Sequence, residues 1–340
     1  MSVTRLELNR EQVLAFRRRA GDLDARLPPG PDSLRRAAWC GLQDSMPRAA
    51  LLSIHARVDG ASPDVWADPA LVQLWGPRFS VFVVPARDHA AFSLALLPDD
   101  AKARHRAQDL AARLSAAIGE RRVPYQQAGQ AIGENAFRLR YAAATGTVLI
   151  RWAGARQPVV WTVPPPATEP AAARLELARR YLHIYGPATA ASFAVWSGIS
   201  PRSSAAAFDA LGGSLLPVRL PTGDAWLLAQ DEAAVRADAG PAAAARLLPS
   251  GDAYFLLQGA DRELLVPDAA RRGALWTPRV WPGAVVVGGE VSGTWRRAGA
   301  TVKVQPWRGL TPAERDAVTV EAQSLPLPGL GRPIAVQWEQ

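Results

Sequence analysis

The alternation of apolar and polar positions is clearest in the middle of the chain. From Arg174 to Tyr185 apolar residues recur every three to four positions, which places them along one face of a helix. Gly186-Pro187 ends that helix, and two shorter helices are predicted at 189–198 and 203–211. Two alternating segments, 215–220 and 225–228, then flank a turn. Three helices followed by a two-stranded wing are typical of a winged helix, a nucleic-acid-binding module.

The side chains of this central segment do not decide which kind of molecule it binds. The pattern predicts that Phe193, Val195 and Trp196 face inward from the second helix. The third helix, the candidate recognition helix, offers Arg202 and no further basic residue. Many winged helices bind only protein, so the element order alone does not decide between DNA and a protein partner.

The first half of the chain also predicts helices followed by strands. A helix begins at Asn9, and two further helices near 33–42 and 48–58 bracket a junction at 41–47. A strand is expected over 78–85, a long amphipathic helix over 99–118 and another strand over 147–152. The proline run 164–166 is the best candidate linker.

The C-terminal part is predicted to be rich in strands. Strands are expected at 254–257, 284–287, 290–296 and 301–304, followed by a final helix at 311–322. The whole chain is thus expected to be α+β, with about three tandem winged-helix modules and a β-rich C-terminal portion. Four parts are predicted. Residues 1–95 form a first winged helix with the candidate catalytic loop, and residues 96–166 form a helical and winged-helix-like module. Residues 167–245 form a central winged helix, and residues 246–340 form the β-rich portion.

Composition bounds the class of protein. With 340 residues, 49% of them hydrophobic, the chain is long enough for two or three domains with a sizeable core. A single cysteine, Cys40, excludes an internal disulfide framework. The first residues lack the apolar core of a signal peptide, and no apolar run of about 18 residues is present to span a bilayer. We therefore expect a cytoplasmic protein without a membrane partner.

The charge of the chain favours a polyanionic partner. The formal net charge is +8 and the pI is about 10.4. Lys102 and Lys303 are the only lysines among 39 basic residues. Arginine pairs bidentately with phosphate, but this ratio also fits the coding bias of a GC-rich genome, and both explanations stay open. The four histidines show no metal-ligand spacing, and the chain has neither a phosphate-binding glycine loop nor a dinucleotide fingerprint, so no metal and no nucleotide cofactor is expected.

Tryptophan is frequent in the C-terminal hairpins. Among the 12 tryptophans, Trp295 is followed by Arg296 and Arg297. An aromatic ring beside arginines can stack on an unpaired base, so these three residues are candidates for nucleic-acid binding. The alternative is that the tryptophans fill the core of a small sheet.

Short motifs along most of the chain resemble one family. They are the segments 41–43 (Gly-Leu-Gln), 47–51 (Pro-Arg-Ala-Ala-Leu), 56–58 (Ala-Arg-Val), 180–182 (Arg-Tyr-Leu), 186–189 (Gly-Pro-Ala-Thr), 193–198, 281–283 (Trp-Pro-Gly) and 293–296 (Gly-Thr-Trp-Arg). Together they are similar to the winged helix DNA-binding proteins that include the AlkZ/YcaQ-like bacterial DNA glycosylases. The resemblance implies tandem winged helices around double-stranded, alkylated DNA and metal-free removal of bulky N7-alkylated purines.

The resemblance also implies a catalytic site. The family signature is Gln, one intervening residue, then Gln or Asp, which falls here on Gln43, Asp44 and Ser45. Ser45 thus departs from the pattern. An N7-alkylated purine is already a cationic leaving group, so the enzyme must mainly position water near C1′ and stabilise positive charge there. A carboxylate does this better than an amide, and a hydroxyl does it poorly.

Two roles for these residues remain open. In the enzymatic interpretation Gln43 orients water, Asp44 activates it or stabilises the sugar cation, and Arg48, Arg57 and Arg296 hold phosphates. In the alternative, Gln43 and Asp44 only hydrogen-bond backbone at a helix end. The first interpretation corresponds to a monofunctional DNA glycosylase, which could provide resistance to a DNA-alkylating natural product. The second corresponds to a non-catalytic DNA-binding or regulatory protein. A protein-interaction scaffold is a third possibility.

Overall fold

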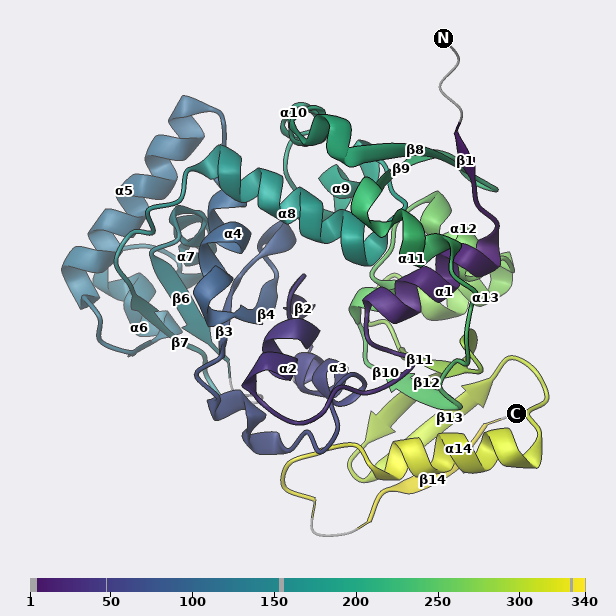
Figure 1. Cartoon of the computed structure of the whole chain (residues 1–340). Helices are drawn as coiled ribbons and strands as arrows, with labels where there is room; N and C mark the ends of the chain where they lie inside the picture. The colour runs from purple at the N-terminus through teal and green to yellow at the C-terminus, as the bar shows by residue number, and fades with distance from the viewer. Residues whose placement is uncertain (1–4, 47, 153–155, 331–332, 340) are drawn as a thin grey trace.

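The computed structural model describes residues 5–46, 48–152, 156–330 and 333–339. Helices surround four β-sheets in this part of the chain, and helix α8 (Pro170–Tyr185) runs through the middle of the molecule (Figure 1). The mixed α+β class expected from the sequence is confirmed. The number of winged-helix modules and the boundaries between them stay predictions.

The N-terminal part forms a small three-stranded sheet with helices around it. Helix α1 begins as predicted, because Asn9 and Gln12 form a reciprocal capping box at its start. The sheet has the order β2-β4-β3 and both of its pairings are antiparallel. The elements are β1 (Leu6–Glu7), α1 (Arg10–Ala20), α2 (Pro31–Ala37), β2 (Leu42–Gln43), α3 (Ala49–His55), β3 (Leu71–Trp75), β4 (Val81–Pro85) and α4 (His89–Ser93).

The next part is a separate lobe, at the left of Figure 1. The predicted long helix, α5, is capped by the Asp100 side chain and buries Leu110, Leu114 and Ile118 on one face. A second small sheet, of order β5-β7-β6, completes the lobe. Its elements are α5 (Ala101–Ile118), β5 (Val123–Pro124), α6 (Tyr125–Ala131), α7 (Leu139–Ala142), β6 (Val148–Arg151) and β7 (Val159–Thr162). The proline run 164–166 lies in the connection from β7 to α8. We call residues 101–162 the α5 lobe.

The central part shows the predicted order of three helices and two strands. It consists of α8, α9 (Ala190–Ser197), α10 (Pro201–Leu211), β8 (Leu215–Leu220), β9 (Gly223–Leu228) and α11 (Glu232–Arg236). Phe193 and Trp196 are buried as predicted, but Val195 is 54% exposed, so its inward orientation was wrong. Residues three apart share a helix face, whereas Val195 is turned about 200° from Phe193.

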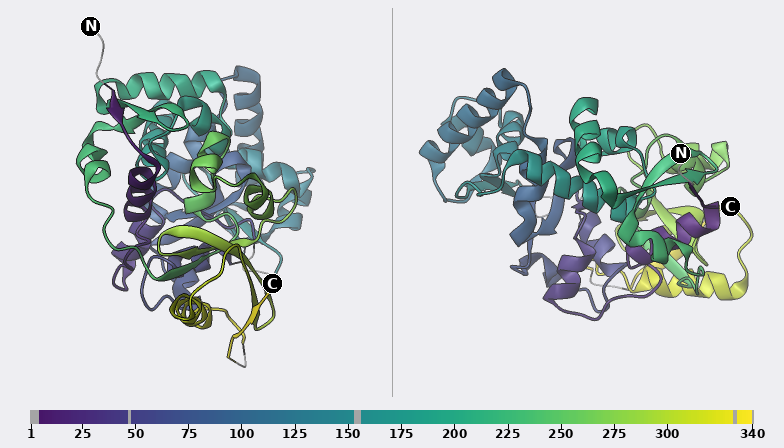
Figure 2. Two further views of the ribbon diagram at one scale, coloured as in Figure 1. Left: turned by 90° about the vertical axis from the view of Figure 1, so that its right-hand side faces the viewer. Right: turned by 45° about the horizontal axis from the view of Figure 1, so that its top comes forward.

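The C-terminal part is a five-stranded sheet with helix α14 along one face (Figure 2). The strands run in the order β10-β11-β12-β13-β14, and Gly288-Gly289 turns β11 into β12. The strand predicted at 254–257 was wrong: residues 253–255 form a 3₁₀ turn, because the Asp252 carboxylate accepts the N–H of Tyr254. The elements are β10 (Ala245–Leu248), α12 (Ala260–Leu265), α13 (Ala269–Leu275), β11 (Gly283–Val287), β12 (Glu290–Ala298), β13 (Thr301–Pro306), α14 (Pro312–Gln323) and β14 (Ala335–Trp338).

An aromatic cluster joins the central helices to the N-terminal sheet. Tyr181 and Tyr185 of α8 stack with ring centroids 4.9 Å apart, and both rings contact Trp196 of α9. The Trp196 ring in turn meets Phe82 of β4 edge-on at 6.4 Å. Since β4 pairs with β2, this buried cluster fixes the strand that ends in Gln43.

Candidate active site

The strand that presents Gln43 is held close to two aromatic rings. Gly41 has a φ of +80°, and a Cβ there would lie 2.9 Å from Phe92 and 3.0 Å from Phe82. Only glycine accommodates both conditions. Leu42 and Gln43 then pair with Val83 and Phe82 of β4. Within the junction expected at 41–47, Leu42 and Gln43 thus form a tightly positioned short strand.

The strand alternation separates the side chains of Leu42 and Gln43. Leu42 is buried in the cluster formed with α2 and α3, while Gln43 points to the other face and is half-buried. Nη2 of Arg78 donates a 2.9 Å hydrogen bond to Oε1 of Gln43. Gly251 approaches the same amide from the C-terminal part, and a Cβ there would lie 3.3 Å from Gln43 Nε2. Gln43 therefore keeps partial solvent access with its amide held on two sides.

Asp44 lies inside the protein. Only 2% of Asp44 is exposed. One carboxylate oxygen accepts the N–H of Ala50 at 3.0 Å, and the other accepts Nε2 of Gln73 at 2.6 Å. Burial raises the pKa of Asp44 to about 7, against the lowering effect of these two hydrogen bonds. The carboxylate joins the start of α3 to strand β3 and does not reach the side of the strand where Gln43 lies.

Ser45 and Arg48 complete the junction. Ser45 is half-buried and its hydroxyl forms no hydrogen bond with the residues described. Arg48 is half-buried, adopts a left-handed conformation (φ 69°) and precedes α3 as its N-cap residue. Both side chains are nearer to solvent than that of Asp44.

Arg57 does not have the accessible position expected of a phosphate ligand. Only 2% of this residue is exposed, and its guanidinium donates to both carboxylate oxygens of Asp252, at 2.7 and 2.9 Å. A third hydrogen bond reaches the carbonyl of Ser53. The ion pair fixes the segment after Gly251 against α3, so in this structure Arg57 supports the site from within.

Trp295 likewise lies in a core. It is 6% exposed, packs in the cluster between the five-stranded sheet and α14, and donates its indole N–H to the carbonyl of Leu248 at 2.9 Å. The expected stacking on a base is therefore corrected, because both faces of a buried ring are already in contact with protein. Arg296 and Arg297 are exposed on the same strand, β12, and each donates to a backbone carbonyl nearby.

The predicted nucleic-acid-binding residues do not form one cluster. Arg202 is exposed near the start of α10, at the top of Figure 1, whereas Arg296 and Arg297 belong to the sheet at the lower right. Among the predicted site residues, only Gln43, Asp44, Ser45 and Arg48 come from one segment, which runs from the end of β2 to the start of α3. No sequence motif indicated Arg78, which reaches Gln43 from a turn 35 residues away.

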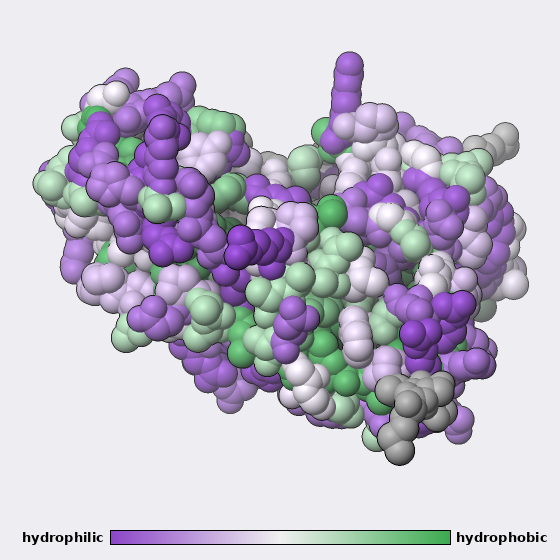
Figure 3. Space-filling model, turned by 90° about the horizontal axis from the view of Figure 1, so that it is seen from above, coloured by the Kyte–Doolittle hydropathy of each residue, from purple (hydrophilic) through white to green (hydrophobic). Residues whose placement is uncertain are grey.

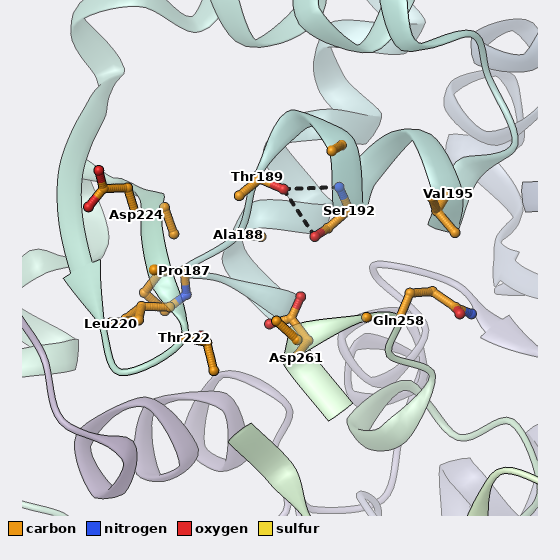
Figure 4. Close-up of a pocket in the computed structure, with 15 residues that line it drawn as sticks. Pro187, Ala188, Thr189, Ser192, Val195, Leu220, Thr222, Asp224, Gln258 and Asp261 are labelled. Atoms are coloured by element: carbon orange, nitrogen blue, oxygen red, sulfur yellow. Dashed lines mark hydrogen bonds between the residues drawn. The ribbon is translucent and has the colours of Figure 1, made fainter. Parts of the chain in front are cut away.

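A cavity of about 280 Å³ lies on the central part of the molecule (Figure 4). It is enclosed by the start of α9, where Thr189 and Ser192 hydrogen-bond, by the turn between β8 and β9, and by residues 258–261. None of the predicted site residues lines it. Within residues 5–46, 48–152, 156–330 and 333–339, no group of three His, Cys, Asp or Glu side chains is placed to hold a metal ion. In the same residues, no helix has the length and apolarity to cross a membrane.

Comparison with known proteins identifies the family. The family model described as "DNA glycosylase AlkZ-like" matches residues 36–326, so the chain belongs to the AlkZ-like DNA glycosylase family. Among solved structures, Streptomyces sahachiroi DNA glycosylase AlkZ has the same fold, with a TM-score of 0.78 at 20% identity over 98% of this chain and 100% of that one. No curated protein is similar enough in sequence to count as a match. The family resemblance expected from the sequence motifs is confirmed, and membership of this family supports a DNA glycosylase function in DNA repair.

Proposed function

We propose that this protein is a monofunctional DNA glycosylase that hydrolyses the N-glycosidic bond of bulky N7-alkylated purines. The observation that supports this most directly is the Gln43 amide, which is half-exposed and fixed on two sides in a chain of this glycosylase family. Resistance to a DNA-alkylating natural product is a setting in which such an activity would be useful.

The chemistry needs a positioned water more than an acid. The alkylated base carries a positive charge and leaves as a neutral purine, so protonation of the base contributes little. An amide held in one orientation offers both an acceptor and a donor, and Gln43 can align water toward C1′ with them. No metal is required for this step.

Asp44 enters the proposal in a different role from Gln43. Because its carboxylate is buried and bonded to Ala50 and Gln73, we assign it to positioning. It holds the loop so that Gln43 and Ser45 keep their places. Ser45, which is half-buried at the position of the family's second polar residue, is then the side chain beside the reacting water, and its hydroxyl is a weaker partner than an amide or a carboxylate.

DNA binding is supported by the distribution of charge. The α5 lobe holds ten Lys and Arg against three Asp and Glu, a net +7 of the chain's +8. Figure 3 shows that the surface is hollowed between this lobe, at the left, and the rest of the molecule, and that hydrophilic side chains dominate the lobe. Such a basic wall attracts a phosphate backbone and releases its counterions. Its exposed members include Lys102, Arg106, Arg121, Arg122 and Arg138.

A second candidate is a DNA-binding protein without glycosylase chemistry. Two observations favour it: a hydroxyl stands where the family has Gln or Asp, and the neighbouring carboxylate of Asp44 is withdrawn into the core. This protein would keep the basic lobe and the salt-sensitive affinity for DNA.

Excision assays separate the two candidates. Duplexes with a single N7-methylguanine or a bulkier N7 adduct are incubated with the protein, heated in alkali and examined for strand cleavage at an abasic site. The proposal predicts cleavage at the adduct only, without metal, and more from the bulkier lesion. Salt-sensitive binding to every duplex without any cleavage would replace the enzyme by the non-catalytic binder.

A further inference from the structure

We propose that Arg78 is a positioning residue of the active site, which orients the Gln43 amide and at the same time binds a phosphate of the DNA strand that holds the lesion. The inference rests on the proposed function and extends it to a residue that no sequence motif indicated. It follows from the backbone, the hydrogen bonds and the charge of Arg78.

The turn that presents Arg78 is held in an unfavourable backbone conformation. Arg78 and Phe79 both have positive φ values, 55° and 53°. Non-glycine residues avoid this region, and two in succession persist only where the surroundings enforce them, most often at functional sites. Here Gly76 closes the turn by donating to the carbonyl of Ser80 at 2.9 Å. Gly198 allows the end of α9 to approach, since a Cβ there would lie 3.1 Å from the Arg78 Cα.

The guanidinium joins two parts of the chain at the site. Nη2 donates to Gln43 Oε1 at 2.9 Å, and Nη1 donates to the backbone carbonyl of Trp196 in α9. Because the amide oxygen is fixed, Nε2 of Gln43 lies toward Gly251. The second lone pair of Oε1 stays available to a water molecule. Arg78 thus determines which atom of the amide meets that water.

The positive charge of Arg78 is not neutralised by any carboxylate among the described residues. Both of its acceptors are neutral, and no carboxylate in the described part of the chain forms an ion pair with it, whereas the buried Arg57, Arg174 and Arg180 are all paired with Asp side chains. Burial lowers the pKa of Arg78, and the guanidinium nevertheless stays charged. A half-buried cation without an anion is costly. Of its five N–H groups two are engaged, which leaves three for an anion.

A DNA phosphate is the anion that the site would receive. The deoxyribose at the reacting carbon has a phosphate on each side, so a cation that touches Gln43 is within reach of one of them. The phosphate would neutralise Arg78, so that its charge would not oppose the positive charge that develops at C1′. Binding of the strand and orientation of Gln43 would then be coupled through one side chain.

Two substitutions and a control test the proposal in the full-length protein. Arg78→Lys keeps the charge but loses the fork that reaches two acceptors. Arg78→Gly removes the side chain and suits the positive φ, so it does not add backbone strain. Arg236→Ala is the control, because it removes an exposed arginine that, among the described residues, forms an ion pair only with Glu232 on the same helix. The measurements are the single-turnover excision rate at saturating protein and the dependence of DNA affinity on salt.

The two variants are expected to differ in a defined way. Arg78→Lys should bind DNA within threefold of wild type with the same salt slope, but excise at least tenfold more slowly. Arg78→Gly should also reduce the slope of log Kd against log salt by about 0.9, the value for one phosphate contact. Its melting temperature should be no lower than that of wild type. The control should match wild type in rate, affinity and slope.

Other results would overturn the proposal. If wild type excises and Arg78→Lys does so at the same rate, Arg78 does not orient Gln43, while the proposed function stands. An unchanged salt slope in folded Arg78→Gly removes the phosphate contact. If wild type excises no alkylated purine at all, the proposed function fails, and the role of Arg78 in it fails as well.

Discussion

Replacement of Arg57 by alanine tests whether this residue supports the site from within or contacts DNA. The ion pair with Asp252 is almost wholly enclosed, with side-chain exposures of 3% and 0%. Arg57→Ala would leave the Asp252 carboxylate buried with only Ser53 and a backbone N–H as partners. Removing one member of a buried pair costs about 3–5 kcal/mol of the free energy of unfolding.

This loss of stability corresponds to a measurable change in melting temperature. At about 2.1 cal/mol/K per residue, unfolding of 340 residues has an entropy of roughly 0.7 kcal/mol/K. The melting temperature should therefore fall by roughly 4–7 °C. The double variant Arg57→Met, Asp252→Leu is the control, because apolar side chains of similar size remove the uncompensated charge and should recover most of the loss.

The same pair predicts how stability depends on pH. Burial alone would raise the pKa of Asp252, but the attraction and hydrogen bonds of Arg57 outweigh it and lower the pKa below its usual value. The stabilisation is thus present above the unfolded carboxyl pKa of about 3.9 and is lost as the pH falls through the folded value.

The Arg57→Ala variant is compared with wild type in two measurements. Calorimetry gives the melting temperature, and DNA titrations at several salt concentrations give the salt slope. A variant that melts within 1 °C of wild type but shows a salt slope reduced by about 0.9 would refute the structural role and restore Arg57 as a phosphate ligand.

Four further predictions concern other residues of the account. Because burial raises the pKa of Asp44 to about 7, the neutral carboxyl is favoured in the folded state, so the contribution of Asp44 to stability should be greatest below the unfolded pKa of about 3.9 and decline toward pH 7, by at most about 4 kcal/mol; the free energy of unfolding of wild type relative to Asp44→Asn, from urea unfolding at pH 4.5–7.5, should show this decline, and a difference that does not change with pH would contradict it. Trp295→Ala should cost about 3–5 kcal/mol in urea unfolding as a core truncation, with DNA affinity unchanged; weakened DNA binding without lost stability would return Trp295 to the surface. Ser45→Gln, which restores the family's second amide, should raise the single-turnover excision rate roughly tenfold, and a rate at or below that of wild type would show that this position does not contact the reacting water. Arg202→Ala should lower the salt slope by about 0.9 if α10 meets the backbone, and an unchanged slope would place α10 outside the interface.

The sequence predicted the elements with strong local signals. The helix start at Asn9, the helix predicted at 189–198 and the strands predicted at 284–287 and 290–296 depend on neighbouring residues, so the pattern reveals them. The helices predicted on either side correctly left Gln43 outside a helix. The family motifs are likewise local. They also gave the family, which the match over residues 36–326 confirms.

The burial of side chains and their long-range contacts could not be predicted from the sequence. Arg57 and Trp295 stand in motifs that also suit a DNA surface, but their positions depend on Asp252 and Leu248, which are distant along the chain. The 254–257 segment is a short apolar run of the kind found in buried strands, yet a hydrogen bond to the Asp252 side chain accompanies a 3₁₀ helix over 253–255. The role of Arg78 could not be predicted, because a positive φ at a non-glycine residue has no signature in the amino-acid sequence.

The most direct test of the account is the single-turnover excision rate of Gln43→Ala beside that of wild type, on one duplex with a bulky N7-alkylguanine. Loss of the water-orienting amide should reduce the rate at least a hundredfold, while DNA affinity and melting temperature stay near those of wild type. Equal rates for the two proteins would contradict the claim that hydrolysis takes place beside the Gln43 amide.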